Sequence, residues 1–165
     1  MEYQGGGEAA TLEPLHEHLF EYKTHMMQNY GAGVQACYRG PRLYDTPETQ
    51  AAVTEVIQWY KKYRDILNSD MIHLRRPDAR DWDGFIHVNP HKKEKGLAMF
   101  FNPTHQEITR TIHIPLYYTG LTQTARIREK EQKPVTYKLN RDYTVELTVK
   151  IPANGYTWYV VEAAD

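Results

Sequence analysis

The sequence predicts an α+β protein in which a short helix-strand-helix segment is followed by an antiparallel β-sandwich. Before residue 70 the apolar residues recur every three or four positions, which is the period of a helix. After residue 70 they recur at every second position, which is the period of a strand, and turn-forming residues separate the alternating runs. We therefore expect two domains, a helical segment at residues 1–69 and a sandwich at residues 70–165.

Two helices are expected in the first domain, with a strand between them at 34–38. The first helix should stop at Gly31 and Gly33, because glycine commonly terminates helices. The second should begin with Thr46 as its N-cap and Pro47 at its first helical position. The apolar stripes consist of Leu12, Leu15, Leu19, Tyr22 and Met26 in the first helix, and of Val53, Val56, Ile57, Tyr60 and Leu67 in the second.

About eight short strands are expected in the second domain. Turn chemistry separates them, including the pairs Asn89-Pro90 and Asn102-Pro103. We expect Trp158, with Tyr156, to fill the core between the sheets. The predicted strands are 71–75, 84–89, 96–102, 108–116, 124–129, 134–139, 143–151 and 156–162, a spacing typical of a sandwich.

The composition argues against several classes of function. Twenty Lys and Arg residues stand against 21 Asp and Glu residues, and this balance gives no basic surplus for binding nucleic acid. No apolar run approaches the roughly 18 residues of a membrane span, and the first ten residues lack the apolar core of a signal peptide. The single cysteine, Cys37, excludes an intrachain disulfide and a cysteine zinc site. We expect no nucleic-acid or membrane partner, and the sequence indicates no compartment.

The loop at residues 39–45 is the candidate functional site. Two helices cannot bury both faces of a lone strand, but this order of elements is also the last turn of a (β/α)₈ barrel, whose strand-to-helix loops face the active site. There, polar side chains would hydrogen-bond sugar hydroxyls and a tyrosine would stack on a pyranose ring. The residues so placed are Arg39, Arg42, Tyr44 and Asp45.

A structural alternative for the same loop is favoured, because helix caps and surface ion pairs are common. Asp45 and Thr46 would cap the second helix, while Arg39 and Arg42 would pair with acidic residues of the first helix.

Other chemically active residues form no recognisable site. The eight histidines lack the spacing of a metal centre, and Ser69 lacks the Gly-x-Ser-x-Gly turn of a nucleophile. Cys37 lies in an apolar run, which favours a buried thiol. The charged hairpin at 75–83 contains Trp82, and local pairing of its charges is favoured over a carbohydrate or interdomain contact. We expect no metal ion, no cofactor and no catalytic residue in this chain.

Three segments carry a resemblance to a known group of enzymes. Helix 57–67 has the pattern Tyr-Lys-x-x-Arg-x-x-Leu, and the segments 83–90 and 98–103 each end in Asn-Pro. This order resembles the C-terminal region of retaining glycoside hydrolases of the α-galactosidase or α-glucosidase kind. In those enzymes a (β/α)₈ barrel ends in a long helix that runs directly into an antiparallel β-sandwich.

The resemblance implies a carbohydrate-active protein that is not catalytic by itself. Retaining hydrolases use two carboxylates roughly 5–5.5 Å apart. In the resembled enzymes both lie on middle strands of the barrel, upstream of the region matched here, and Asp45 is one carboxylate rather than a pair. We therefore expect a C-terminal fragment or accessory domain of a glycoside hydrolase, inactive when isolated.

The expected partners are carbohydrate and an upstream barrel domain or partner chain. Self-association is also expected, because an uncovered apolar strand edge promotes it. The alternative is an independent carbohydrate-binding or protein-interaction β-sandwich module with its helices docked on the sheet. The run 34–38 contains little that is polar, as in a strand buried on both faces, and this favours the fragment.

Overall fold

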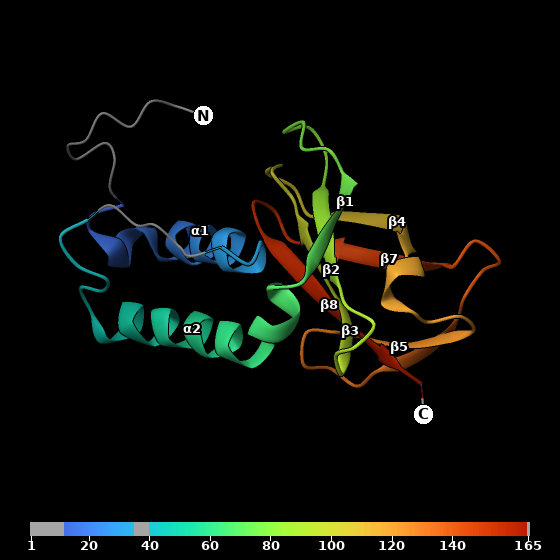
Figure 1. Cartoon of the computed structure of the whole chain (residues 1–165). Helices are drawn as coiled ribbons and strands as arrows, with labels where there is room; N and C mark the ends of the chain where they lie inside the picture. Colours follow the sequence, from blue (N-terminus) through green and yellow to red (C-terminus); the bar gives the residue numbers. More distant parts are fainter. Residues whose placement is uncertain (1–11, 35–39, 165) are drawn as a thin grey trace. The chain divides into compact units, whose positions relative to one another are not determined.

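The structure is a computed structural model that describes residues 12–34 and 40–164 (Figure 1). The chain divides into two compact units, Met1–Leu67 and Asn68–Asp165. The described part of the first unit is helical, and the second unit contains eight strands. The predicted α+β class, with a sandwich-like arrangement of antiparallel strands, is confirmed.

The helical unit contains a 3₁₀ turn, η2 (Leu15–His18), and two helices, α1 (Leu19–Gly31) and α2 (Pro47–Leu67). Helix α1 ends at the predicted glycines, and Gly33 has a φ of 73°, a left-handed conformation that suits glycine. The stripes are largely confirmed, because Tyr22 and Met26 of α1 and Val56 and Leu67 of α2 are buried.

The start of α2 is fixed by two threonines that bond to each other's backbone. The amide of Thr49 donates to Oγ1 of Thr46 at 3.2 Å, and the amide of Thr46 donates to Oγ1 of Thr49 at 3.0 Å. This is the reciprocal arrangement of a capping box, with threonine in the place usually taken by Glu or Gln. The predicted cap at Thr46 and first helical residue Pro47 are confirmed.

Helices α1 and α2 are neighbours that run in the same direction (Figure 1). The contacts between the two segments occur in the same order along both of them, as expected for parallel helices. They are His16 with Asp45 at 2.8 Å, Lys23 with Glu55 at 2.6 Å, and the rings of Tyr30 and Tyr60 with centroids 5.0 Å apart. Parallel packing of two consecutive helices is typical of successive βα units, in which a strand lies between the helices.

The strand predicted at 34–38 falls mainly outside the described residues. Only Val34 is described, and its side chain is exposed. The polarity argument based on this run therefore stays a prediction.

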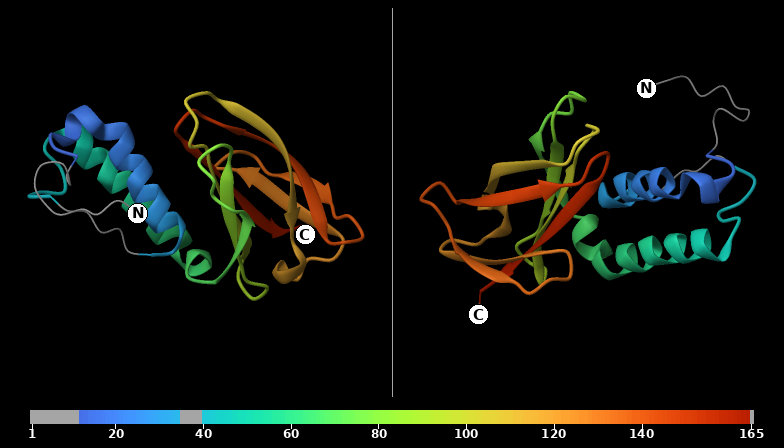
Figure 2. Two further views of the ribbon diagram at one scale, coloured as in Figure 1. Left: turned by 90° about the horizontal axis from the view of Figure 1, so that it is seen from above. Right: turned by 180° about the vertical axis from the view of Figure 1, so that it is seen from behind.

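The second unit contains all eight expected strands in two antiparallel sheets (Figure 2). A six-stranded sheet has the order β1-β2-β3-β8-β5-β6, and β4 and β7 form a two-stranded sheet. The strands are β1 (Asp70–Arg75), β2 (Asp83–Val88), β3 (Glu94–Phe101), β4 (Ile108–Pro115), β5 (Thr124–Glu129), β6 (Val135–Lys138), β7 (Thr144–Ile151) and β8 (Tyr156–Ala163).

The main core lies between these sheets and consists of alternate residues of each strand. Ile112 faces Leu147 across the β4–β7 pair, and Ala98 faces Tyr159 across the β3–β8 pair. All four belong to one buried apolar cluster. The alternation along β4 and β7 follows the predicted period of two.

The placement of Trp158 corrects the prediction that it fills this core. Tyr159 is in the core cluster, so the preceding residue points to the opposite face of the same strand. Trp158 is opposite Met99, and both side chains are buried on that other face. A run of apolar residues, as in β8, does not reveal which face meets the second sheet.

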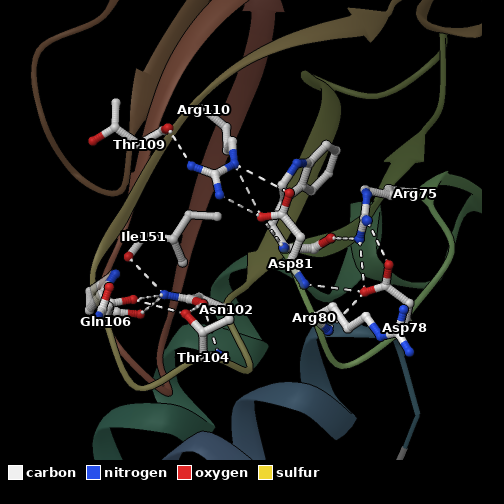
Figure 3. A network of polar contacts seen from close by, with 12 residues as sticks. Arg75, Asp78, Arg80, Asp81, Asn102, Thr104, Gln106, Thr109, Arg110 and Ile151 are labelled. Atoms are coloured by element: carbon white, nitrogen blue, oxygen red, sulfur yellow. Dashed lines mark hydrogen bonds and ion pairs between the residues drawn. The ribbon is translucent and has the colours of Figure 1, made fainter.

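The two Asn-Pro pairs have the same local role, which is to fix a turn after a strand. Oδ1 of Asn102 accepts the Thr104 amide at 2.9 Å, and Oδ1 of Asn89 accepts the His91 amide at 2.9 Å. Such turns are typical of asparagine. Asn102 is also buried and donates to the carbonyls of Gln106, Ile151 and Pro152, joining the β3–β4 and β7–β8 connections (Figure 3).

The charged β1–β2 hairpin pairs its charges locally, as the sequence favours. Arg75 is 2.7 Å from Asp78, and Arg110 of β4 is 3.0 Å from Asp81, linking the two sheets (Figure 3). Trp82 packs against the core and makes an edge contact with the Phe100 ring. Local pairing therefore accounts for Arg75 and Asp78, whereas Asp81 pairs with a strand of the other sheet.

Replacing Asn102 should destabilise the sandwich much more than replacing Asn89. Asn102→Ala removes every bond of a buried amide and leaves the carbonyl of buried Ile151 without this donor, at a cost of about 2–3 kcal/mol. Asn89→Ala removes fewer bonds at a half-buried site and should cost about 1 kcal/mol. Urea unfolding monitored by tryptophan fluorescence measures both, and equal losses would contradict the role given to Asn102.

Candidate functional site

The candidate loop is described from Gly40 onward and leads into the capped start of α2. Arg39 lies outside the described residues. Leu43 and Tyr44 have exposed side chains, at 58% and 45%. The hydroxyl of the buried Tyr22 of α1 donates a hydrogen bond to the Leu43 carbonyl at 2.9 Å, and this bond anchors the loop to α1.

Asp45 is held from two directions. Its Oδ2 accepts hydrogen bonds from the backbone amide of His16 at 3.1 Å and from His16 Nδ1 at 2.8 Å. Its Oδ1 accepts the hydroxyl of Thr49 at 3.0 Å. The Asp45 side chain is only 6% exposed, whereas the imidazole of His16 is 48% exposed. The carboxylate therefore joins the segment before α1 to the segment before α2.

The charge states follow from these bonds. Burial by itself raises the pKa of Asp45, but the hydrogen bonds from the His16 ring, the His16 amide and Thr49 together lower that pKa to about 2. The hydrogen bond to Asp45 is the main cause that raises the pKa of His16 above its ordinary value of 6.5. Near neutral pH Asp45 is a carboxylate fixed in a structural pair.

Arg42 makes a second contact across the same end of the two helices. Its Nη2 lies 3.2 Å from Oε2 of Glu13, and the Arg42 side chain remains 54% exposed. The structural alternative for the loop is met in part. Arg42 pairs with an acidic residue, although Glu13 precedes both helices, and the Asp45 carboxylate accepts from His16 and the Thr49 hydroxyl while Thr46 caps α2. Tyr44 is 45% exposed, and none of these contacts tests the predicted substrate-binding role.

His16 and Glu13 organise this loop, although the sequence pattern predicts no role for them. Each lies 29 positions from its partner, and no residue pattern marks a contact at that separation. The parallel packing of α1 and α2 brings them together. The only local signal for these two contacts is that the sequence near residue 13 contains acidic residues and histidines.

A second concave surface lies wholly within the sandwich. It is an open hollow with a volume of about 820 Å³, beside edge strand β1, the β2–β3 turn and the 3₁₀ turn η3 (Tyr117–Thr119). Its lining residues are Asp70, Met71, Ile72, His73, Val88, Asn89, Pro90, His91 and Tyr118. The residues of this hollow come from three separate segments, and no local pattern in the sequence predicts it.

Two further properties hold for the described ranges 12–34 and 40–164. No three His, Cys, Asp or Glu side chains gather there as a metal site would require. No helix there has the length and apolar character needed to cross a membrane.

Comparisons with solved structures support the resemblance inferred from the sequence. An α-galactosidase I from Mortierella vinacea matches 92% of this chain with a TM-score of 0.58 and 12% identity. A glycoside hydrolase family 27 β-L-arabinopyranosidase from Geobacillus stearothermophilus matches 86% of it with a TM-score of 0.56 and 10% identity. The chain shares its fold with part of these glycoside hydrolases.

The match covers only a part of those enzymes. The chain spans 38% of the Mortierella enzyme and 31% of the Geobacillus enzyme. No protein-family model matches this chain, and no curated protein matches it in sequence. At these identities the similarity is one of fold.

The His16–Asp45 pair should give a distinctive titration. The Asp45 contribution to stability is present above pH 3.8 and is lost as pH falls towards about 2, because the folded pKa is lowered. The His16 contribution is present below pH 6.5 and is lost as pH rises through its raised pKa. NMR titration of the His16 ring should therefore show a raised pKa that returns towards 6.5 in Asp45→Asn.

An unchanged His16 titration in the variant would show that the pair does not form in solution.

Proposed function

We propose that this chain is the part of a carbohydrate-active glycoside hydrolase in which the last helices of a (β/α)₈ barrel lead into a C-terminal β-sandwich. The observation that carries the proposal is the parallel packing of α1 and α2, with their starts joined by the His16–Asp45 pair. Successive helices of a βα barrel run parallel in this way, and both of their starts lie at the active-site face. The fold shared with two glycoside hydrolases over 86–92% of the chain supports the same assignment.

The loop before α2 would then contribute to a sugar site completed by an upstream barrel. Tyr44 offers an exposed ring for stacking on a pyranose, and Arg42 offers guanidinium donors at 54% side-chain exposure. Arg39 remains part of this proposal from the sequence alone. Asp45 would act mainly as a positioning residue, because three hydrogen bonds already occupy its carboxylate.

This geometry is not that of a complete catalytic site. A retaining hydrolase needs two carboxylates roughly 5–5.5 Å apart, one as nucleophile and one as acid/base. Residues 40–46 contain Asp45 and no second carboxylate. A pKa of about 2 also makes Asp45 unsuited to donating a proton at neutral pH.

The purified chain should show no turnover of aryl α-galactosides, aryl α-glucosides or their β-anomers. Release of nitrophenol gives the measurement, and Asp45→Asn should match the wild type at the blank rate. Turnover that survives purification and disappears in Asp45→Asn would show that the chain carries its own catalytic carboxylate.

The fragment and the independent module differ in their behaviour in solution. If the helical unit belongs on a barrel, its apolar surface, which includes exposed Phe20 and Val34, should make the full chain self-associate and bind the dye ANS. A chain trimmed to residues 69–165 should be less associated at equal concentration. Sedimentation velocity measures both, and a monomeric full chain with an associating trimmed sandwich would favour the module.

A further inference from the structure

The hollow beside β1 has an aromatic wall held in place by buried anchors. In the turn η3 and its flanks, Leu116 and Thr119 are fully buried, whereas Tyr117 and Tyr118 are 62% and 61% exposed. Gly120 has a φ of 76°, and its backbone lies so close to the β2–β3 turn that an added Cβ would be 3.0 Å from Cβ of Pro90. The backbone that follows the two exposed tyrosines thus lies against the β2–β3 turn, at Pro90.

The two tyrosine rings belong to a cluster of three aromatic rings. Tyr117 makes edge contacts with the rings of Tyr118 and Tyr143, at centroid distances of 5.2 and 5.4 Å. Tyr118 lines the hollow. Tyr118 is not part of the buried core cluster, and an aromatic side chain with few rotatable bonds loses little entropy when a ligand packs on it.

The polar lining favours an uncharged ligand with many hydroxyl groups. The carboxylate of Asp70 and the ring of His91 have no hydrogen-bond or ion-pair partner among the described residues, and the turn that carries His91 is fixed by Asn89. No lysine or arginine lines the hollow, so nothing there selects an anion. Its volume of about 820 Å³ lies within the roughly 300–1,000 Å³ of small-molecule sites.

We propose that this hollow is a carbohydrate-binding site of the sandwich, in which Tyr118 stacks on a sugar ring while Asp70 and His91 hydrogen-bond its hydroxyl groups. The ligand is a neutral oligosaccharide, because a pyranose combines an apolar face with a rim of hydroxyl groups. The apolar face matches the aromatic wall of the hollow, and the hydroxyl groups match its polar side chains. The site lies entirely within the second unit and does not depend on the proposed barrel or on the loop before α2.

The test is an NMR titration of the full ¹⁵N-labelled chain with melibiose, raffinose, maltotriose, mannotriose and cellotriose. At least one sugar should shift amides within residues 70–73, 89–91 and 117–118. Tyr118→Ala should weaken that binding about fivefold or more, the equivalent of losing one stacking contact. Tyr118→Phe keeps the ring and should bind within about twofold of the wild type.

Tyr44→Ala provides the matched control, since it removes an exposed tyrosine from the other unit. It should leave the affinity of the hollow unchanged. No shift with any of the sugars, or equal affinity in Tyr118→Ala, would overturn the proposal. Binding lost in Tyr44→Ala but kept in Tyr118→Ala would also overturn it, while supporting the loop as the sugar site.

Discussion

The burial of alternate apolar side chains between a six-stranded and a two-stranded sheet is the constraint on which the sandwich depends. Each strand has one correct register, because a shift by one residue would turn its core residues to the wrong face. The pairing of Ile112 with Leu147 and of Ala98 with Tyr159 satisfies this constraint in both sheets. The connections then have fixed end points, which is why the buried Asn102 can bridge three carbonyls from two connections.

The same core also fixes the surface features that carry the binding proposal. Leu116 is buried in the core cluster, and its amide donates to the Tyr143 carbonyl at 2.9 Å. This anchor sets the position of the turn that exposes Tyr117 and Tyr118. The proposed ligand surface would thus depend on core residues that set the position of neighbouring exposed aromatic residues.

The helical unit relies on a different kind of interaction. Its apolar stripes pack α1 against α2, but hydrogen bonds to Asp45, Thr46 and Thr49 set where α2 starts. These bonds place the 40–46 loop beside the start of α1. Asp45 anchors this loop, whereas Tyr44 stays exposed in it. A structural role and a ligand-binding role are therefore compatible in this loop, since they require different residues. The proposal of a barrel face rests on this arrangement, and the chain shares its fold with part of two glycoside hydrolases.

The sequence by itself determined the elements, because their signals are local. Periods of three to four and of two distinguish helices from strands, Thr46-Pro47 and Gly31 mark helix ends, and turn pairs such as Asn102-Pro103 separate strands. The tertiary structure alone decided which strands share a sheet, which face of β8 carries Trp158, and which distant residues meet. The His16–Asp45 pair and the hollow beside Tyr118 arise from packing between segments far apart in the chain, and such packing leaves no periodic trace in the sequence.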